Sequence, residues 1–349
     1  MKTSFVSTSA ISQAMRYQML RMQADLVKAE QEMVSQRVAD TGLKLGARTT
    51  QSVSLSRDVD RLKGLIDSNG LVSARLATTQ DGLNQLTELA KSLLPTMTTA
   101  LSGPIDPNIP RTEANAALGT LTAILNTGQN GEYLFAGINT DVKPINDFAD
   151  PASANRTAFN AAFATYFGFA IDDPAAATIQ PAGMNDFIAT ALEPQFMGAG
   201  WQGTWSNATD EKIVARITLS ETTAASVIAN VEGVRKLAMG AALVAGLMGA
   251  GLNEQTRLAV LGQAASLVTE SVADLGSAQG ELGIVQQRVE KASERISMQV
   301  DLFQTNLQQL EGVDPYEVST RVSSLMAQIE TSYTLTARIQ QLSLVRFLT

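Results

Sequence analysis

Apolar residues recur at alternating spacings of four and three residues near both ends of this 349-residue chain. That spacing places them on one stripe of an α-helix and is typical of a coiled-coil seam. Because a single amphipathic helix must cover its stripe, the simplest arrangement packs N-terminal helices against C-terminal ones. The first seam comprises Met15, Met19, Met22, Leu26, Ala29 and Met33.

The same periodicity continues inward from both ends of the chain. It runs from residue 62 to 93, where Pro95 is expected to end the helix, and it returns over 114–125 and 261–310. Pro315 then opens a last helix with an apolar tail. The apolar residues of that segment include Val318, Val322, Leu325, Ile329, Ile339, Leu342, Leu344 and Phe347.

The terminal stripes allow two interpretations. Methionine is flexible and polarizable, so the N-terminal stripe could be ordinary core within one chain or an adaptable surface for other copies. Single helices at the extreme ends, separated from the other helices by breaks near Gly46 and Pro315, favour the second interpretation. We therefore predict an assembly interface made of Met15, Met19, Met22, Leu26 and Met33 together with the C-terminal residues from Val318 to Phe347 named above.

The middle of the chain has a different character. Helical seams disappear between residues 139 and 232, where ten of the eighteen aromatic residues gather, and residues 212–220 alternate like a strand. This stretch is expected to hold a small core of its own. The predicted fold class is mainly α, an elongated antiparallel helical bundle or coiled coil formed by both chain ends, with an inserted mixed α/β or β-rich module.

Three domains follow from these boundaries. The terminal polymerisation helices are residues 1–48 plus 314–349, the helical bundle is 49–138 plus 237–313, and the inserted outer module is 139–236.

The composition excludes several classes of function. Histidine and cysteine are absent, which removes the Ser-His triad, the cysteine nucleophile, the histidine base and the tetrahedral zinc site. No metal-ligand spacing or phosphate loop occurs, so we expect no enzyme activity and no cofactor. The net charge of −8 without a basic cluster argues against nucleic-acid binding.

Residues 237–252 are uncharged and apolar, which invites a membrane interpretation. The run is shorter than the ~20 residues that span a bilayer, so a buried helix is expected and membrane insertion is not. The N-terminus lacks the apolar core of a cleaved signal peptide. Its Ser/Thr-rich start fits either a frayed end or an uncleaved export signal.

Several segments resemble the flagellin and hook-associated protein family. Residues 126–139, NTGQNGEYLFAGIN, are similar to a segment of hook–filament junction proteins, and residues 280–290, GELGIVQQRVE, are similar to a stretch of flagellins. At the start of the second segment, Gln279 just before it and Gly280 stand where Arg and Ala would be expected. The residues that carry these two likenesses are Asn126, Gly131, Tyr133, Leu134, Phe135, Ala136, Gly137, Leu282 and Gly283.

The resemblance implies a structural subunit of the bacterial flagellum that joins the hook to the filament. It implies export in an unfolded state by the flagellar type III apparatus, without a cleaved signal peptide, and an extracellular location. The implied partners are other copies of the chain in a ring or helical assembly, another hook-associated protein, flagellin, and an export chaperone at the C-terminal helices. A flagellin-like filament subunit and a type III secreted translocator remain the alternatives.

Overall fold

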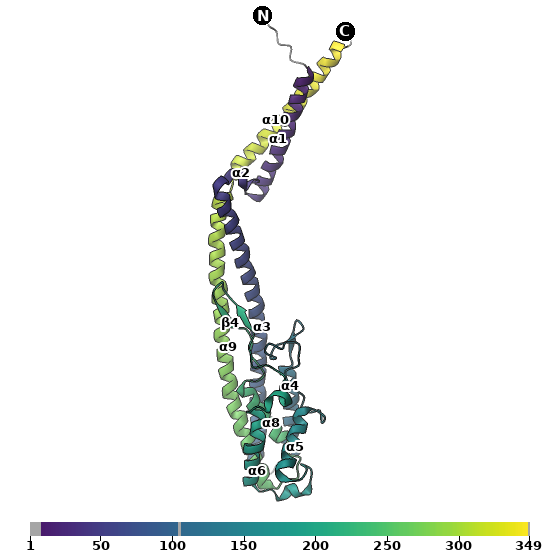
Figure 1. Ribbon diagram of the computed structural model, residues 1–349, viewed down its shortest axis with the longest axis vertical. Coiled ribbons are helices and arrows are strands. Elements are labelled where there is room, and N and C mark those ends of the chain that lie inside the picture. Colours follow the sequence, from purple (N-terminus) through teal and green to yellow (C-terminus); the bar gives the residue numbers. More distant parts are fainter. Residues whose placement is uncertain (1–7, 104–105, 348–349) are drawn as a thin grey trace. The chain divides into compact units, whose positions relative to one another are not determined.

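The computed structural model describes residues 8–103 and 106–347, with side chains placed for residues 10–103 and 106–338. The chain forms two compact units. The terminal unit combines the residues up to 64 with those from 296 onward, and the central unit is residues 65–295. Long helices contribute to both units: α3 is Thr49–Ser102 and α9 is Glu254–Glu311 (Figure 1).

The remaining helices and strands precede, separate and follow these two along the sequence. The elements of the terminal unit are α1 (Thr8–Ser35), α2 (Thr41–Leu45), η1 (Gly46–Arg48) and α10 (Pro315–Phe347). The helices of the central unit are α4 (Asn108–Leu125), α5 (Ala154–Phe167), η2 (Pro174–Thr178), α6 (Pro181–Phe187), η3 (Ile188–Leu192), α7 (Glu193–Phe196), η4 (Trp201–Trp205) and α8 (Glu232–Leu247). Its strands are β1 (Gly128–Gln129), β2 (Glu132–Tyr133), β3 (Val214–Arg216) and β4 (Thr222–Ala224).

Helices α3 and α9 lie antiparallel in the central unit. Gln279 Nε2 of α9 donates to Thr87 Oγ1 of α3 at 2.9 Å, and Asn69 Nδ2 of α3 donates to Ser293 Oγ of α9 at 3.1 Å. Residue numbers therefore increase along α3 as the numbers of the residues that it contacts decrease along α9. The prediction of a mainly α protein in which helices from both halves of the chain pack antiparallel is confirmed.

Pro95 does not end α3, contrary to the expectation from sequence. The helix continues to Ser102, and Met97 and Ala100 extend the buried stripe beyond Leu93. Pro95 lies on the exposed side, where the missing N–H removes one helical hydrogen bond but no packing surface. Burial of the following turns outweighs that local loss.

The inserted residues are more helical than predicted, and they do not have a separate core. The strands β3 and β4 pair over three residues each, whereas α5, α6 and α7 supply most of the regular structure. Their aromatic side chains join one continuous cluster with the apolar residues of α3, α4, α8 and α9. The expectation of an independent small core is therefore wrong, because the aromatic residues face the bundle helices.

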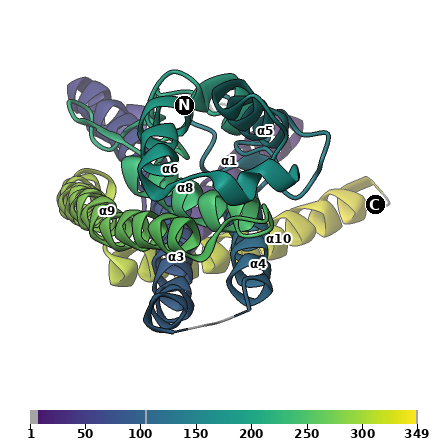
Figure 2. The same cartoon turned by 90° about the horizontal axis from the view of Figure 1, so that it is seen from below.

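Helix α8 explains the apolar run of residues 237–252. It is buried along nearly its whole length and lies between α9 and the inserted helices (Figure 2). A Cβ on Gly233 would lie 2.8 Å from Leu275 N, and one on Gly240 would lie 2.8 Å from Val268 Cγ2. The glycines thus permit the close approach of α8 to α9, as expected for a buried helix.

Among the described residues, α9 is the one helix long and apolar enough, by length and composition alone, to cross a bilayer. Its apolar side chains Leu261, Val268, Leu275 and Leu282 are buried in the core of the central unit. Packing within the chain thus covers part of its apolar window, of which 33% is buried.

Candidate assembly surface of the terminal helices

Helices α1 and α10 pack against each other in the terminal unit (Figure 1). Ala29 of α1 meets Val318 and Val322 of α10 in a small buried cluster, and Leu26 and Leu325 pack around it. Met22 and Ile329 are also buried. These seam residues are therefore covered within one chain, and the use of the predicted interface between copies stays a prediction.

The predicted interface is not buried evenly. Met15 and Met19 are half-buried, and Met33 is 42% exposed at the end of α1. The side chains of Ile339, Leu342, Leu344 and Phe347 lie outside the described residues. Along α1 the seam is thus tight from Met22 to Ala29 and looser on both sides of that stretch.

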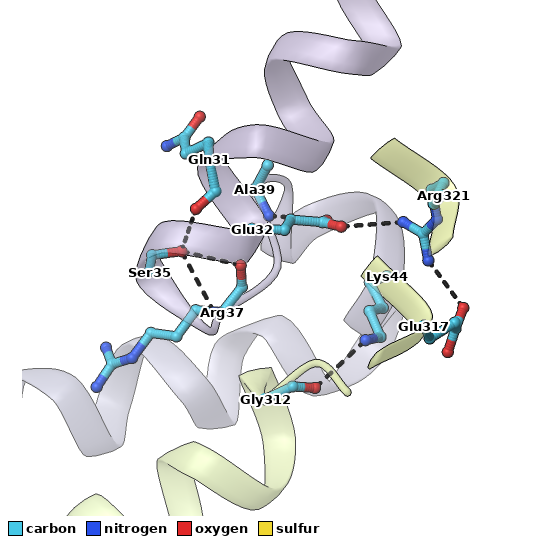
Figure 3. Close-up of polar contacts among 9 residues, drawn as sticks. All are labelled: Gln31, Glu32, Ser35, Arg37, Ala39, Lys44, Gly312, Glu317 and Arg321. Atoms are coloured by element: carbon cyan, nitrogen blue, oxygen red, sulfur yellow. Dashed lines mark hydrogen bonds and ion pairs between the residues drawn. The ribbon is translucent and has the colours of Figure 1, made fainter. Parts of the chain in front are cut away.

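A polar network links α1 and α10 near the C-terminal end of α1 and the N-terminal end of α10 (Figure 3). Arg321 of α10 bridges Glu32 of α1 at 3.0 Å and Glu317 of its own helix at 2.8 Å. The other oxygen of Glu32 accepts from the backbone N of Ala39 at 3.1 Å. Glu32 therefore links both helices to the segment that follows α1.

The two chain segments beyond these helices run side by side. Val38 N donates to Glu311 O at 2.9 Å, and Val313 N donates to Gln36 O at 3.2 Å. The largely buried Glu311 carboxylate accepts from Ser52 Oγ and from Arg37 at 3.5 Å. These bonds fix where α1 ends and α10 begins in the terminal unit.

A second apolar stripe on α1 was missed by the sequence analysis. Its members are largely exposed: Tyr17 at 78%, Leu20 at 64%, Val27 at 63% and Val34 at 84%. At 100° per residue, these outer positions lie about 100–160° around α1 from the centre of the buried seam. The seven-residue spacing of Leu20, Val27 and Val34 was visible in the sequence, offset from the seam that we had followed.

Helix α10 also leaves large side chains uncovered. Tyr316, Met326 and Leu335 are exposed, as is Tyr333, although its hydroxyl accepts from Gln23 Nε2 of α1 at 3.0 Å. Within the described residues, the paired helices thus present apolar groups outward from both partners. Exposed apolar side chains on both paired helices make this part of the molecule a candidate for contact with another protein.

The segment 126–137 builds a structural anchor in the central unit. Asn130 and Gly131 both have positive φ, at 55° and 87°, between strands β1 and β2. This Asn-Gly pair is the preferred sequence for a two-residue hairpin turn. Asn126 fixes the same segment, because its side chain both donates to Ile145 O and accepts from Ile145 N at 3.0 Å.

The apolar residues of this segment are buried. Leu134, Phe135 and Ala136 are buried, and Tyr133 is half-buried. A Cβ on Gly82 of α3 would lie 2.8 Å from Phe135 Cζ, so the ring requires glycine there. Gly137 has a φ of +70°, and a Cβ on it would lie 2.7 Å from Thr209 O.

The α9 motif residues differ from each other. Leu282 is buried in the central core, whereas a Cβ on Gly283 would meet nothing within 4 Å. Packing explains the leucine, and nothing in the structure explains the glycine.

Two matches to known families cover the chain ends that the structure brings together. Residues 6–140 match the bacterial flagellin N-terminal helical region, and residues 265–348 match the bacterial flagellin C-terminal helical region. Together they cover more than half of the sequence. The chain belongs to the flagellin superfamily. As a flagellin-type protein, it is a self-assembling structural subunit of the bacterial flagellum.

The superfamily fold extends to a solved structure. A "putative flagellar hook-associated protein" from Vibrio parahaemolyticus aligns with 76% of this chain and 97% of its own, at 10% identity and a TM-score of 0.53. At that identity the likeness concerns the fold alone. No curated protein matches the sequence significantly.

The described part of this flagellin-superfamily chain holds no group of three or more acidic side chains placed to bind a metal ion. The features that stand out in the terminal unit are instead apolar stripes and a polar network between two helices. Such an arrangement is suited to contacts with other helices.

Proposed function

We propose that this chain is the structural adaptor that joins the flagellar hook to the filament, assembled through its terminal helices. The feature that carries the proposal is the pairing of α1 with α10 by a small buried seam, while a second apolar stripe remains uncovered. The junction-like segment 126–139, which forms the anchor around Phe135, supports the adaptor over the filament subunit.

The sizes of the two stripes suggest coupled folding and assembly. The buried cluster of the α1–α10 pair contains small or medium side chains, so little apolar surface is removed from water within one chain. Neighbouring copies would cover the outer stripe of Tyr17, Leu20, Val27 and Val34 and add the missing stabilisation. Repetition of one such contact by rotation and rise generates a ring or a tube.

The proposal includes the partners expected from the resemblance. Other copies of the chain would contact the outer stripe, and a second hook-associated protein and flagellin would contact the two axial ends. Before assembly, the exposed apolar residues of α10 would need protection, which fits an export chaperone at the C-terminal helices. Export would proceed unfolded and without a cleaved signal peptide, and the final location would be extracellular.

The outer stripe gives the sharpest molecular test. The double variant Leu20→Asp/Val27→Asp should leave the α1–α10 pair helical, because both side chains are exposed in one chain, but should prevent polymerisation. Met22→Asp should disturb the pair itself, because Met22 is buried. The control Gln18→Asp adds charge at an exposed polar position and should assemble normally. Assembly of the double variant at the parent's critical concentration would refute the role of the outer stripe.

The adaptor function is tested in cells that lack the protein. Electron microscopy should show hooks without filaments, with flagellin released into the medium. Normal filaments would reject the adaptor and favour a minor filament subunit. Counting copies per filament then separates the two, since an adaptor occurs in one short zone and a filament subunit occurs along the whole length.

A further inference from the structure

The central unit contains an open pocket of about 580 Å³ outside the assembly surface. It lies where α4, α5 and the C-terminal end of α8 meet. Its polar lining comes from Arg111, Asn115, Arg156, Asn160 and Asp172. Two guanidinium groups therefore line one cavity.

Glycines at the end of α8 keep this pocket open. A Cβ on Gly249 would lie 2.7 Å from Arg111 Nη1, and one on Gly246 would lie 2.5 Å from Phe159 Cε1. Because Gly249 has no side chain, Arg111 can lie directly against the end of α8. The glycine-rich run that first suggested a membrane segment thus also shapes a polar cavity.

Arg156 is held in place by aromatic rings. Its guanidinium carbon lies 4.7 Å above the ring of Phe148, within the range of a cation–π contact. Phe148 stacks on Trp205 with centroids 5.1 Å apart, and Trp205 stacks on Trp201 at 5.8 Å. The side chain is therefore positioned by the aromatic core and not by a carboxylate.

The positive charges in this pocket are not neutralised within the described chain. No described carboxylate lies within ion-pair distance of Arg111 or Arg156, although the exposed Asp172 lines the same cavity. Burial and the nearby charge of Arg111 both lower the pKa of Arg156.

We propose that the pocket formed by Arg111, Arg156, Asn115 and Asn160 binds an oxyanion of the phosphate or carboxylate class. Guanidinium groups bind such oxyanions through paired, charge-assisted hydrogen bonds. A bound anion would relieve the repulsion between the two arginines, and it would accept from the amide Nδ2 of Asn160, which lines the same cavity. The site is independent of the assembly surface.

The test is a titration of the purified full-length monomer with inorganic phosphate by calorimetry and thermal melting, against chloride at equal ionic strength. Saturable binding and a raised melting temperature are expected. Arg111→Gln and Arg156→Gln should each weaken phosphate binding at least tenfold, since each removes charge-assisted hydrogen bonds to the anion. Lys291→Gln removes one exposed charge from α9 and should bind phosphate like the parent.

A second measurement separates an anion site from a structural role of the arginines. In a buffer whose only anion is chloride, Arg111→Gln should leave the melting temperature unchanged or raise it, because the substitution removes repulsion. A melting temperature that falls in this buffer, binding retained in the double arginine variant, or no phosphate effect beyond chloride would overturn the proposal. Titration with acetate then identifies the source: comparable affinity indicates a polypeptide carboxylate, and much tighter phosphate binding indicates a phosphate ligand.

Discussion

The terminal and central units of this chain are both helical, yet they are stabilised differently. In the terminal unit, α1 and α10 share a buried cluster centred on Ala29, Val318 and Val322, with charged contacts at its base. In the central unit, eight large aromatic side chains including Trp201 and Trp205 are almost fully buried among leucines. Since stability follows buried apolar area, the central unit should fold alone and the terminal pair should depend on assembly.

The largest expected effect concerns the aromatic core. Trp205→Ala should destabilise the central unit by about 3–5 kcal/mol, because it leaves a cavity beside Phe148 and Phe196. Chemical denaturation followed by tryptophan fluorescence and circular dichroism measures it. Trp205→Phe is the milder control, since the indole Nε1 has no hydrogen-bond partner among the described residues. Equal losses in both variants would contradict an account based on volume.

A second prediction tests the close approach at α8. Gly246→Ala should cost about 1–3 kcal/mol, because the new Cβ would overlap the ring of Phe159. The matched control is Gly262→Ala in α9, where a Cβ meets nothing within 4 Å. That change should instead stabilise the helix by about 0.5–1 kcal/mol through propensity. Similar effects in both variants would show that local helix propensity, not packing, dominates at α8.

A third prediction concerns Lys236 of α8, whose ion pairs with one carboxylate of α8 and two of α9 are called the clamp below. Lys236 lies 2.9 Å from Glu232, 3.2 Å from Glu270 and 2.9 Å from Asp274. Lys236→Met should cost about 1–2 kcal/mol, discounted because the carboxylates are partly exposed. The control Lys291→Met changes an exposed lysine of α9 and should have little effect.

The clamp also has a defined pH dependence. Hydrogen bonds to the three carboxylates raise the pKa of Lys236 well above its usual range. Its contribution is therefore complete below the unfolded pKa near ~10.4 and declines only as pH rises through the folded value. The stability difference between parent and Lys236→Met should stay constant from about pH 7 to 9. A difference that shrinks with pH inside this window would reject the clamp.

The smallest expected effect on the central unit comes from the terminal pair. Val322→Asp puts a charge into the α1–α10 seam and should lower the helical signal of the monomer. It should leave the main unfolding transition within about 0.5 kcal/mol of the parent. Ser323→Asp, one residue away on the exposed side, is the control for added charge. A large shift of the main transition by Val322→Asp would mean that the two units unfold together.

Local patterns predicted the long helices well, since each stripe depends on spacing along one helix. The seam from Met15 to Ala29, the break at Gly46 with its φ of +53°, and the antiparallel bundle all followed from such spacing. The fold of residues 139–236 did not, because its aromatic side chains are buried against helices far away in the sequence. The prediction that Pro95 ends the helix was wrong for the same reason. Packing against residues far away in the sequence outweighed the local helix-breaking effect of proline.

The candidate sites also differ in how much of each could be predicted from the sequence. Spacing alone identified the seam residues Met22, Val318 and Val322. The same spacing was present in the outer stripe of Leu20, Val27 and Val34. That stripe was missed because the sequence pattern does not show which surface packs against a helix. Only the tertiary structure decided which of the two stripes α10 covers. Only the tertiary structure could bring Arg111, Arg156 and Gly249 to one pocket, because electrostatics and cavity shape depend on distances between segments that the order of residues leaves open.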